Sequence, residues 1–303
     1  MKIARVLNTG LQHLLAKLFP FFQRLGIHVT PISFYQPIPD TRTLKDDLWV
    51  RRSEMIGMDM NEAGQLDLLA RFVAQFKDEY ERLPRTRTPT PHQYYVNNGT
   101  FESVDGEILY CMIRHFKPRK IFEIGSGNST FLSAQAVLKN KGEDGVAGEL
   151  VAFEPYPNRV LRAGFPGLSR LVETRIQEVP LSEFDKLADG DILFIDSSHV
   201  LKIGSDVHYE YLDVLPRLRT GVIVHIHDIF LPAEYPKDLV LKARNFWNEQ
   251  YLLQAFLAFN ESFEILWAGS YMHLKHPDEL ASAFSSYERS KTWPGSFWLR
   301  RVK

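Results

Sequence analysis

The residues best suited to bind a ligand form a short glycine-containing run, Phe122-Glu-Ile-Gly-Ser-Gly-Asn-Ser-Thr130. Gly125 and Gly127 have no Cβ, so the backbone there can approach a bound molecule that a larger residue would obstruct. We expect a helix to begin near Ser129 and to direct its free amide groups at the same ligand. A single Gly-x-Gly is weak evidence, because tight turns without a ligand also use it.

An acidic residue strengthens the case for a ligand that contains a ribose. Glu154 follows the next apolar run, where its carboxylate can accept hydrogen bonds from both ribose hydroxyls. Nicotinamide enzymes place an acid similarly, but their fingerprint needs a third glycine, and Thr130 stands at that position. The loop therefore favours a nucleoside ligand without a pyrophosphate.

A second group of chemically capable residues follows two later apolar runs. Asp196 and Asp228 each end such a run, with His199 and His227 close in sequence. The carboxyl ends of parallel strands share one edge of a sheet, so we expect these side chains to lie near the ligand. His225 is assigned to the core, facing away from His227.

Three interpretations of this group remain open. In the first, carboxylates and an imidazole of this group bind a divalent cation (Mg, Mn, Fe or Zn), and imidazole suits the last three better than magnesium. In the second, His199 or His227 is a general base without a metal. In the third, the histidines only form hydrogen bonds at the strand ends. The candidate catalytic residues are Asp196, His199 and His227.

Alternating apolar runs and helical patterns must position these residues. We expect the strands at residues 120–124, 150–153, 171–175, 191–195 and 221–227. Strands that alternate with helices indicate a parallel sheet covered on both faces. Two further runs, 263–267 and 295–299, predict an antiparallel C-terminal edge, after a helix expected over 238–259. The predicted fold is α/β, doubly wound and Rossmann-like, with a mostly parallel sheet.

Residues 1–91 are expected to be a helical N-terminal extension, and residues 92–303 the ligand-binding domain. The extension holds an amphipathic helix within 1–26, a Pro-rich arm over 29–40 and a second helix over 61–83. We expect the first helix to pack on the main domain or on a second copy of the chain, giving a homo-oligomer. Peripheral membrane contact is the less favoured interpretation.

Composition narrows the class of protein. The 303 residues are 45% apolar and 24% charged, with a formal net charge of −1. This balance gives no overall electrostatic signature of nucleic-acid binding, and no run approaches the length of a transmembrane segment. Cys111 is the only cysteine, which excludes an internal disulfide and a cysteine-built zinc site. A reducing, cytoplasmic location fits this composition.

Two motifs carry a family resemblance. Glu123-Ile-Gly-Ser-Gly-Asn-Ser-Thr130, followed by Glu154 after the next strand, resembles the class I S-adenosylmethionine-dependent methyltransferases. The runs Phe194-Ile-Asp-Ser-Ser-His199 and Gly221-Val-Ile-Val-His-Ile-His-Asp228 are similar to a branch with macrocin-type sugar O-methyltransferases and cephalosporin-hydroxylase-like proteins. This resemblance covers roughly residues 98–232.

The resemblance implies roles for individual residues. Gly125, Ser126 and Gly127 would line the amino acid end of S-adenosylmethionine, Glu154 would bind the ribose, and Gln177 and Glu178 would lie near the adenine. The full set of expected cofactor contacts is Glu123, Gly125, Ser126, Gly127, Ser129, Thr130, Glu154, Gln177, Glu178, Asp196 and Ser197.

The implied activity is methyl transfer (EC 2.1.1.-) to a hydroxyl group of a small metabolite, with Asp196, His227 and Asp228 at the positions that bind a metal in related methyltransferases. The alternatives are a metal-dependent hydroxylase or hydrolase, or a non-catalytic binding protein on the same scaffold. We expect a small-molecule acceptor and no nucleic-acid partner.

Overall fold

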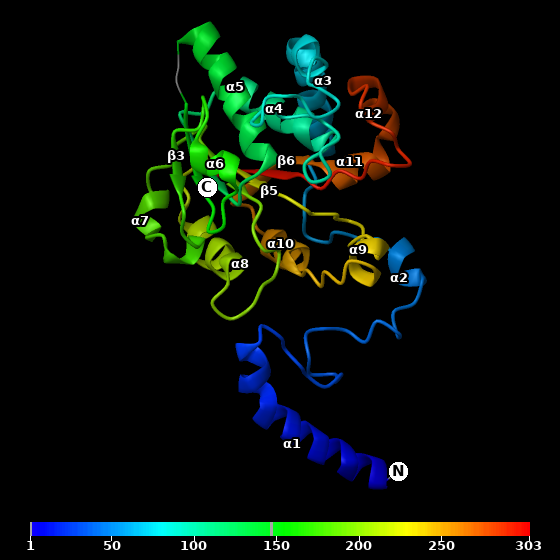
Figure 1. Ribbon diagram of the computed structural model, residues 1–303. Helices are drawn as coiled ribbons and strands as arrows, with labels where there is room; N and C mark the ends of the chain where they lie inside the picture. Colours follow the sequence, from blue (N-terminus) through cyan, green and yellow to red (C-terminus); the bar gives the residue numbers. More distant parts are fainter. Residues whose placement is uncertain (1, 146–147) are drawn as a thin grey trace. The chain divides into compact units, whose positions relative to one another are not determined.

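The computed structural model describes residues 2–145 and 148–303 (Figure 1). The chain forms two compact units. The smaller contains Met1–Val50 and Lys237–Phe246, and the larger contains Arg51–Pro236 and Trp247–Lys303. Among the described residues, no helix is both long and apolar enough to cross a membrane.

A seven-stranded sheet in the order β3-β2-β1-β4-β5-β7-β6 is the frame of the larger unit. Its strands are β1 (Lys120–Ile124), β2 (Glu149–Phe153), β3 (Arg170–Val172), β4 (Ile192–Ile195), β5 (Ile223–Ile226), β6 (Phe263–Ala268) and β7 (Phe297–Arg301). The first five strands pair in parallel, whereas β7 is antiparallel to both β5 and β6. The predicted fold class, a mostly parallel sheet with an antiparallel C-terminal edge, is confirmed.

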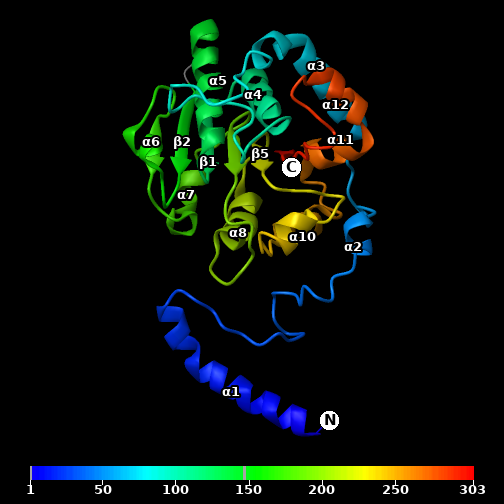
Figure 2. The same cartoon turned by 45° about the vertical axis from the view of Figure 1, so that its right-hand side comes forward.

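Helices cover both faces of this sheet (Figures 1 and 2). One core contains side chains of α3 (Glu62–Tyr80), α4 (Asp105–Phe116), α5 (Asn128–Asp144), α6 (Arg159–Ala163), α11 (Gly269–Lys275) and α12 (Pro277–Ala283). The other contains side chains of η1 (Ile176–Glu178), α7 (Leu181–Phe184), α8 (Asp206–Tyr209) and α10 (Glu249–Leu257). The α8 helix continues as the π-helical η2 (Glu210–Val214) and the 3-10 turn η3 (Leu215–Arg217).

The central strands are buried on both faces and are mostly apolar, because each supplies both cores. In β1, Ile121 packs into the core under α4 and α5, whereas Phe122 packs into the core above α7. Successive side chains of a strand point to opposite faces, so a strand buried on both faces has no polar side. Burying one side chain as large as Phe122 contributes roughly 2 kcal/mol to the stability of the fold.

Two local predictions are wrong. The helix expected over 238–259 is two helices, α9 (Lys237–Leu241) and α10, and Arg244 between them has a positive φ of 63°. The backbone amides of Asn248 and Glu249 both donate to the carbonyl of His199, which fixes where α10 begins. His225 is buried as expected, but its ring lies 5.8 Å from that of His227, because residues two apart in a strand share a face.

The smaller unit contains α1 (Lys2–Arg24), the arm that follows it, α2 (Asp47–Val50) and α9. Lys237 Nζ, at the start of α9, pairs with Asp46 Oδ1 at 2.6 Å. Helix α3, which we assigned to the extension, lies in the larger unit and buries Leu69, Phe72 and Phe76 there. The functional division at residue 91 stays a prediction.

Candidate active site

The glycine loop passes directly against the end of β4. Gly125 has a positive φ of 76°, and a Cβ at this position would overlap the backbone carbonyl oxygen of Asp196. Only glycine combines this backbone conformation with so close an approach. Gly127 is different, because its φ of −175° is ordinary extended backbone and the space around it is open.

Glu154 is held in place by backbone amides at the end of β2. Its Oε2 accepts from Ser126 N at 3.1 Å, and its Oε1 accepts from Tyr156 N at 2.8 Å. Each carboxylate oxygen has a further lone pair for a ligand hydroxyl. The loop after β1 is therefore hydrogen-bonded directly to Glu154, the acid at the end of β2.

Glu123, Ser129 and Thr130 brace this loop from inside the protein. Glu123 Oε1 accepts from Ser129 Oγ at 2.6 Å and from Thr130 Oγ1 at 3.0 Å, and Thr130 Oγ1 in turn accepts from Gly127 N at 3.0 Å. All three polar side chains are buried. Burial raises the pKa of Glu123 to about 8, because its charge would be held away from water.

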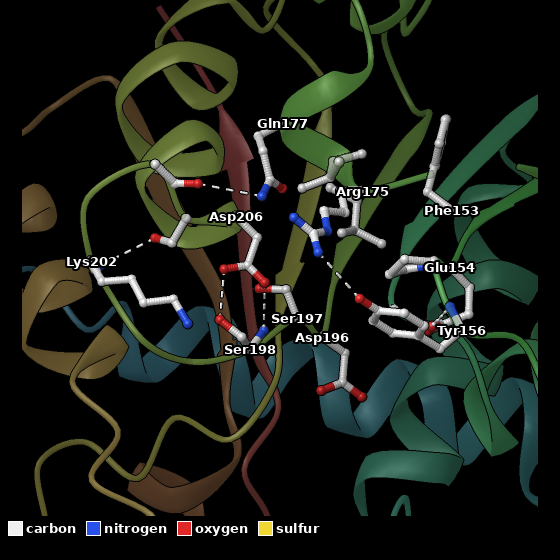
Figure 3. A pocket seen from close by; sticks show the side chains of 16 residues that line it. Phe153, Glu154, Tyr156, Arg175, Gln177, Asp196, Ser197, Ser198, Lys202 and Asp206 are labelled. Atoms are coloured by element: carbon white, nitrogen blue, oxygen red, sulfur yellow. Dashed lines mark hydrogen bonds between the residues drawn. The ribbon is translucent and has the colours of Figure 1, made fainter. Parts of the chain in front are cut away.

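A cavity of about 490 Å³ opens at the carboxyl ends of β1, β2 and β4 (Figure 3). Five of the predicted cofactor contacts line it: Gly125, Glu154, Gln177, Asp196 and Ser197. The braces Glu123, Ser129 and Thr130 are not among its lining residues, nor are Ser126 and Gly127. Glu178 is exposed and also lies outside the lining.

Several residues of this cavity were not singled out from the sequence. Figure 3 shows Arg175 directed across the cavity toward Tyr156, whose hydroxyl lies 3.4 Å from Arg175 Nη2. On the other side, Asp206 accepts from both the amide and the hydroxyl of Ser198. These residues lie in loops after strands or at a helix start, and no local sequence pattern marks them as ligand contacts.

The predicted strand-end residues do meet. One possible ligand atom from each of Asp196, His227 and Asp228, a carboxylate oxygen or an imidazole nitrogen, lies within 4.8 Å of the other two. His227 Nδ1 is 3.5 Å from Asp196 Oδ1 and 3.8 Å from Asp228 Oδ2. Two carboxylates and one imidazole at this separation are a donor set that suits a divalent transition metal ion.

His199 lies beside this cluster and is tethered from behind. Its Nε2 is 3.3 Å from Asp196 Oδ1 and 3.4 Å from Asp228 Oδ2, while its Nδ1 is 2.9 Å from Glu249 Oε2. Glu249, in the first turn of α10, is only 1% exposed. The sequence predicted His199 but not Glu249, which is separated from it by 50 residues.

His227 is likewise held on its far side. Its Nε2 lies 3.5 Å from Asp105 Oδ2, and its ring contacts that of Phe101 at a centroid distance of 4.8 Å. Asp105 also accepts from the amides of Gly295 and Ser296, each at 2.9 Å. Both imidazoles thus have one nitrogen near a buried carboxylate and the other near Asp196 and Asp228.

Buried carboxylates set the electrostatics of this cluster. Burial alone would lower the pKa of His199, but Asp196 and Glu249 outweigh it and raise that pKa to about 10. Burial would raise the pKa of Asp196, yet the attraction of His227 and His199 keeps it below its ordinary value. Burial raises the pKa of both Asp228 and Glu249. The site therefore favours positive charge.

The backbone is strained at two of these residues. His199 and Asp228 adopt positive φ values of 60° and 56°, which L-residues with a side chain rarely do. Each such residue costs of the order of 1 to 3 kcal/mol, and such strain is concentrated at functional sites.

A second cavity of about 490 Å³ adjoins the cluster. His227, Asp228 and Asp105 line it, together with Asn97 and Pro236. The remaining lining residues are Thr100, Glu102, Ser103, Phe230, Ser286, Glu288, Lys291, Thr292, Trp293 and Gly295.

Comparison with known proteins agrees with this site. A family model described as a methyltransferase domain matches residues 122–229. An uncharacterized protein of Archaeoglobus fulgidus is 33% identical over 180 residues, which make up 56% of this chain and 78% of that protein.

Two solved structures are also similar, but only distantly. An O-methyltransferase from Bacillus cereus in complex with SAH is 13% identical, with a TM-score of 0.37 over 95% of this chain and 100% of that one. CmcI with Mg and SAM is 16% identical, with a TM-score of 0.35, and the match covers 75% of this chain and 84% of that one.

The match over residues 122–229 shows that this chain contains a methyltransferase domain. Its mostly parallel sheet places the glycine loop after β1 and Glu154 after β2, where the resemblance to S-adenosylmethionine-dependent methyltransferases led us to expect them.

Proposed function

We propose that this methyltransferase transfers the methyl group of S-adenosylmethionine to a hydroxyl oxygen of a small-molecule acceptor, with a divalent cation at Asp196, His227 and Asp228. One observation carries the proposal. Asp196 lines the cofactor cavity, whereas His227 and Asp228 line the second cavity. The cluster therefore adjoins both, where a methyl donor and an acceptor would face each other.

The first cavity fits the cofactor. Glu154 offers two fixed carboxylate oxygens for the ribose, and the loop at Gly125 lines the same cavity, where the amino acid end would lie. Phe153 and Ile176 supply apolar surface for the adenine, with Gln177 beside them. The volume of about 490 Å³ is in the range of small-molecule sites.

The second cavity fits a polar acceptor. The carboxylates of Glu102 and Glu288 and the ammonium of Lys291 line it, next to the aromatic face of Trp293. Hydroxyl groups can donate to these carboxylates and accept from the ammonium, and the aromatic ring offers an apolar surface. A small hydroxylated metabolite has the chemistry that these residues recognise.

The acceptor hydroxyl must lose a proton as the methyl group leaves the sulfonium and S-adenosylhomocysteine forms. His199 and His227 are the imidazoles at the boundary between the cavities, and each is oriented by a buried carboxylate, Glu249 or Asp105. Of the two, His199 is outside the proposed set of metal ligands. Its pKa of about 10 keeps it protonated when no cation is near, so it can accept the proton only when a cation held by Asp196 and Asp228 lowers that pKa.

The donor set of Asp196, His227 and Asp228 fits a divalent cation, in the order of preference Mn, Fe or Zn before Mg. When bound, such an ion would lower the pKa of an acceptor hydroxyl near it. The chain itself holds the ligands in place. Asp105 contacts the far side of the His227 ring, and Asp228 is fixed in a backbone conformation with positive φ.

Methyl transfer from radiolabelled S-adenosylmethionine to a panel of hydroxylated acceptors tests the proposal. The protein is first treated with chelator, and Mg, Mn, Fe or Zn is then restored singly. We expect labelled product that depends on an added metal. No product with any acceptor and any metal, from protein that binds S-adenosylmethionine, would count against O-methylation.

Two variants separate the metal from the cofactor. Asp228→Ala should abolish metal retention but leave S-adenosylmethionine affinity close to wild type, because Asp228 does not line the cofactor cavity. Asp196→Ala should weaken both, since Asp196 belongs to the cluster and to the cofactor cavity. Metal content equal to wild type in both variants would end the metal assignment.

A hydroxylase or hydrolase would instead change the acceptor without forming S-adenosylhomocysteine.

A cytoplasmic location completes the proposal, whereas the homo-oligomer that we expected from the extension stays a prediction. The buried thiol of Cys111 is consistent with a reducing compartment. The oligomeric state can be read from light scattering of the full chain, where a mass near 35.0 kDa would mean a monomer.

A further inference from the structure

Helix α1 carries an exposed apolar stripe. Leu11, Leu14, Leu18 and Phe21 follow one another at intervals of three or four residues, so they lie on one face of the helix. Their side chains are 54%, 53%, 37% and 58% exposed. Single exposed apolar residues are common, but a continuous row of them marks a surface that binds something.

The charges around this stripe are all of one sign. Lys2, Arg5, Lys17 and Arg24 lie in the helix, and the first acidic residue of the sequence is Asp40. Lys17 and Arg24 are seven residues apart, so they share one side of the helix, along the border of the stripe next to Phe21. The whole chain has a net charge of −1, and the N-terminal segment is therefore basic against an acidic remainder.

The arm that follows α1 also carries exposed aromatic residues. Phe34 and Tyr35 are 96% and 91% exposed, and their rings contact each other edge to face at 5.6 Å. Ile32 beside them is 66% exposed. Aromatic rings with one apolar and one polar part are favoured at the boundary between lipid and water.

We propose that residues 2–38 bind the surface of an anionic lipid bilayer, with α1 lying along the interface. The bilayer satisfies both properties of the helix, because acyl chains take up the stripe while anionic headgroups pair with the lysines and arginines. A nucleic acid would neutralise the cations and leave the stripe exposed. A second copy of α1 would cover the stripe, but it would bring like charges together with no carboxylate in the helix to pair with them.

Co-sedimentation of the full chain with vesicles tests this proposal. One set of vesicles is phosphatidylcholine alone, and the other is equal parts phosphatidylcholine and phosphatidylserine. We expect binding to the anionic vesicles that weakens as salt is raised, because headgroup attraction is screened. Leu14→Glu/Leu18→Glu should reduce the partition coefficient roughly tenfold or more, since it places charges on the stripe.

The matched control is Ala16→Glu/Gln23→Glu, which adds the same negative charge on exposed positions of the opposite face. It should lose much less binding than the stripe variant. Both variants should keep wild-type affinity for S-adenosylmethionine, because their positions lie in the smaller unit.

Three results would overturn the proposal. Wild-type protein that stays in the supernatant with anionic vesicles is one, and equal binding by the two variants is another. The third is a lipid-free oligomer that Leu14→Glu/Leu18→Glu dissociates in a protein that binds no vesicles, which would assign the stripe to a second copy of the chain.

Discussion

At the scale of single residues, the side chain of Glu154 is oriented before any ligand arrives. The amides of Ser126 and Tyr156 hold one carboxylate oxygen each, so little rotational freedom remains to be lost on binding. His199 is oriented in the same way by Glu249. The reacting edge of the site is thus rigid, and changes to single side chains should have separable effects on cofactor binding and on methyl transfer.

Glu154→Ala should weaken S-adenosylmethionine binding by about 1.5 to 3 kcal/mol, because it removes charge-assisted hydrogen bonds to the ribose. Isothermal titration measures this loss. The same titration on Glu178→Ala tests the predicted contact of Glu178 with the adenine. We expect nearly wild-type affinity, because that side chain is exposed and outside the cavity lining. Unchanged affinity in a folded Glu154→Ala protein would refute the ribose assignment.

Glu249→Ala should lower kcat by roughly tenfold to a hundredfold, because His199 loses the partner that fixes its ring. Glu249→Gln keeps a hydrogen-bond acceptor and should lose less. Steady-state kinetics with the acceptor at saturation, together with S-adenosylmethionine affinity, distinguish this role from a structural one. A variant that is less stable but has wild-type kcat would show that Glu249 supports only the fold.

Glu123 should make the protein less stable as pH rises. Its pKa is about 8 in the folded protein and near 4.5 in the unfolded chain, so the folded state binds the proton more tightly. The contribution of Glu123 to the free energy of unfolding is therefore fully present below pH 4.5 and is lost as pH rises toward 8. We expect Tm of Glu123→Gln, relative to wild type, to increase over this interval, and a constant difference would contradict the buried, protonated acid.

At the scale of elements, the contact between the loop after β1 and the end of β4 defines the cofactor cavity. Two glycines of this loop make a matched pair, because a methyl group on Gly125 meets the carbonyl of Asp196 and one on Gly127 meets no protein atom. The first glycine serves the fold, and the second is available to a ligand.

Gly125→Ala should therefore destabilise the protein by about 2 to 4 kcal/mol, through overlap and backbone strain. Gly127→Ala should leave stability within about 1 kcal/mol of wild type but weaken S-adenosylmethionine binding if the cofactor approaches this backbone. Thermal unfolding and titration give the two quantities. Equal destabilisation by both substitutions would contradict the geometry of the loop.

The strands were predictable from the sequence because each is an apolar run with a clear end. Lys120–Ile124 and the two antiparallel strands β6 and β7 were found near their observed positions. The break between α9 and α10 was not, because it depends on the amides of Asn248 and Glu249 reaching the carbonyl of His199. Local periodicity carries no information about such a contact.

At the scale of the whole molecule, the sequence predicted the site residues that follow a local pattern and missed those that only folding brings to the site. Asp196, His227 and Asp228 were predicted because strand ends in a parallel sheet converge at one edge. Asp105 and Glu249 were missed as partners of the two histidines, since each comes from a helix distant in sequence. Buried acids that orient a site leave no local pattern, because folding alone brings them there.

A crystal structure of the protein grown with S-adenosylhomocysteine and Mn²⁺ would test the central claim most directly. The account predicts the nucleoside against Glu154 and an anomalous manganese peak bounded by Asp196, His227 and Asp228, with the second cavity open beyond it. A nucleoside bound elsewhere, or a folded site with the nucleoside present and no manganese at these three side chains, would contradict a metal-assisted transfer between the two cavities.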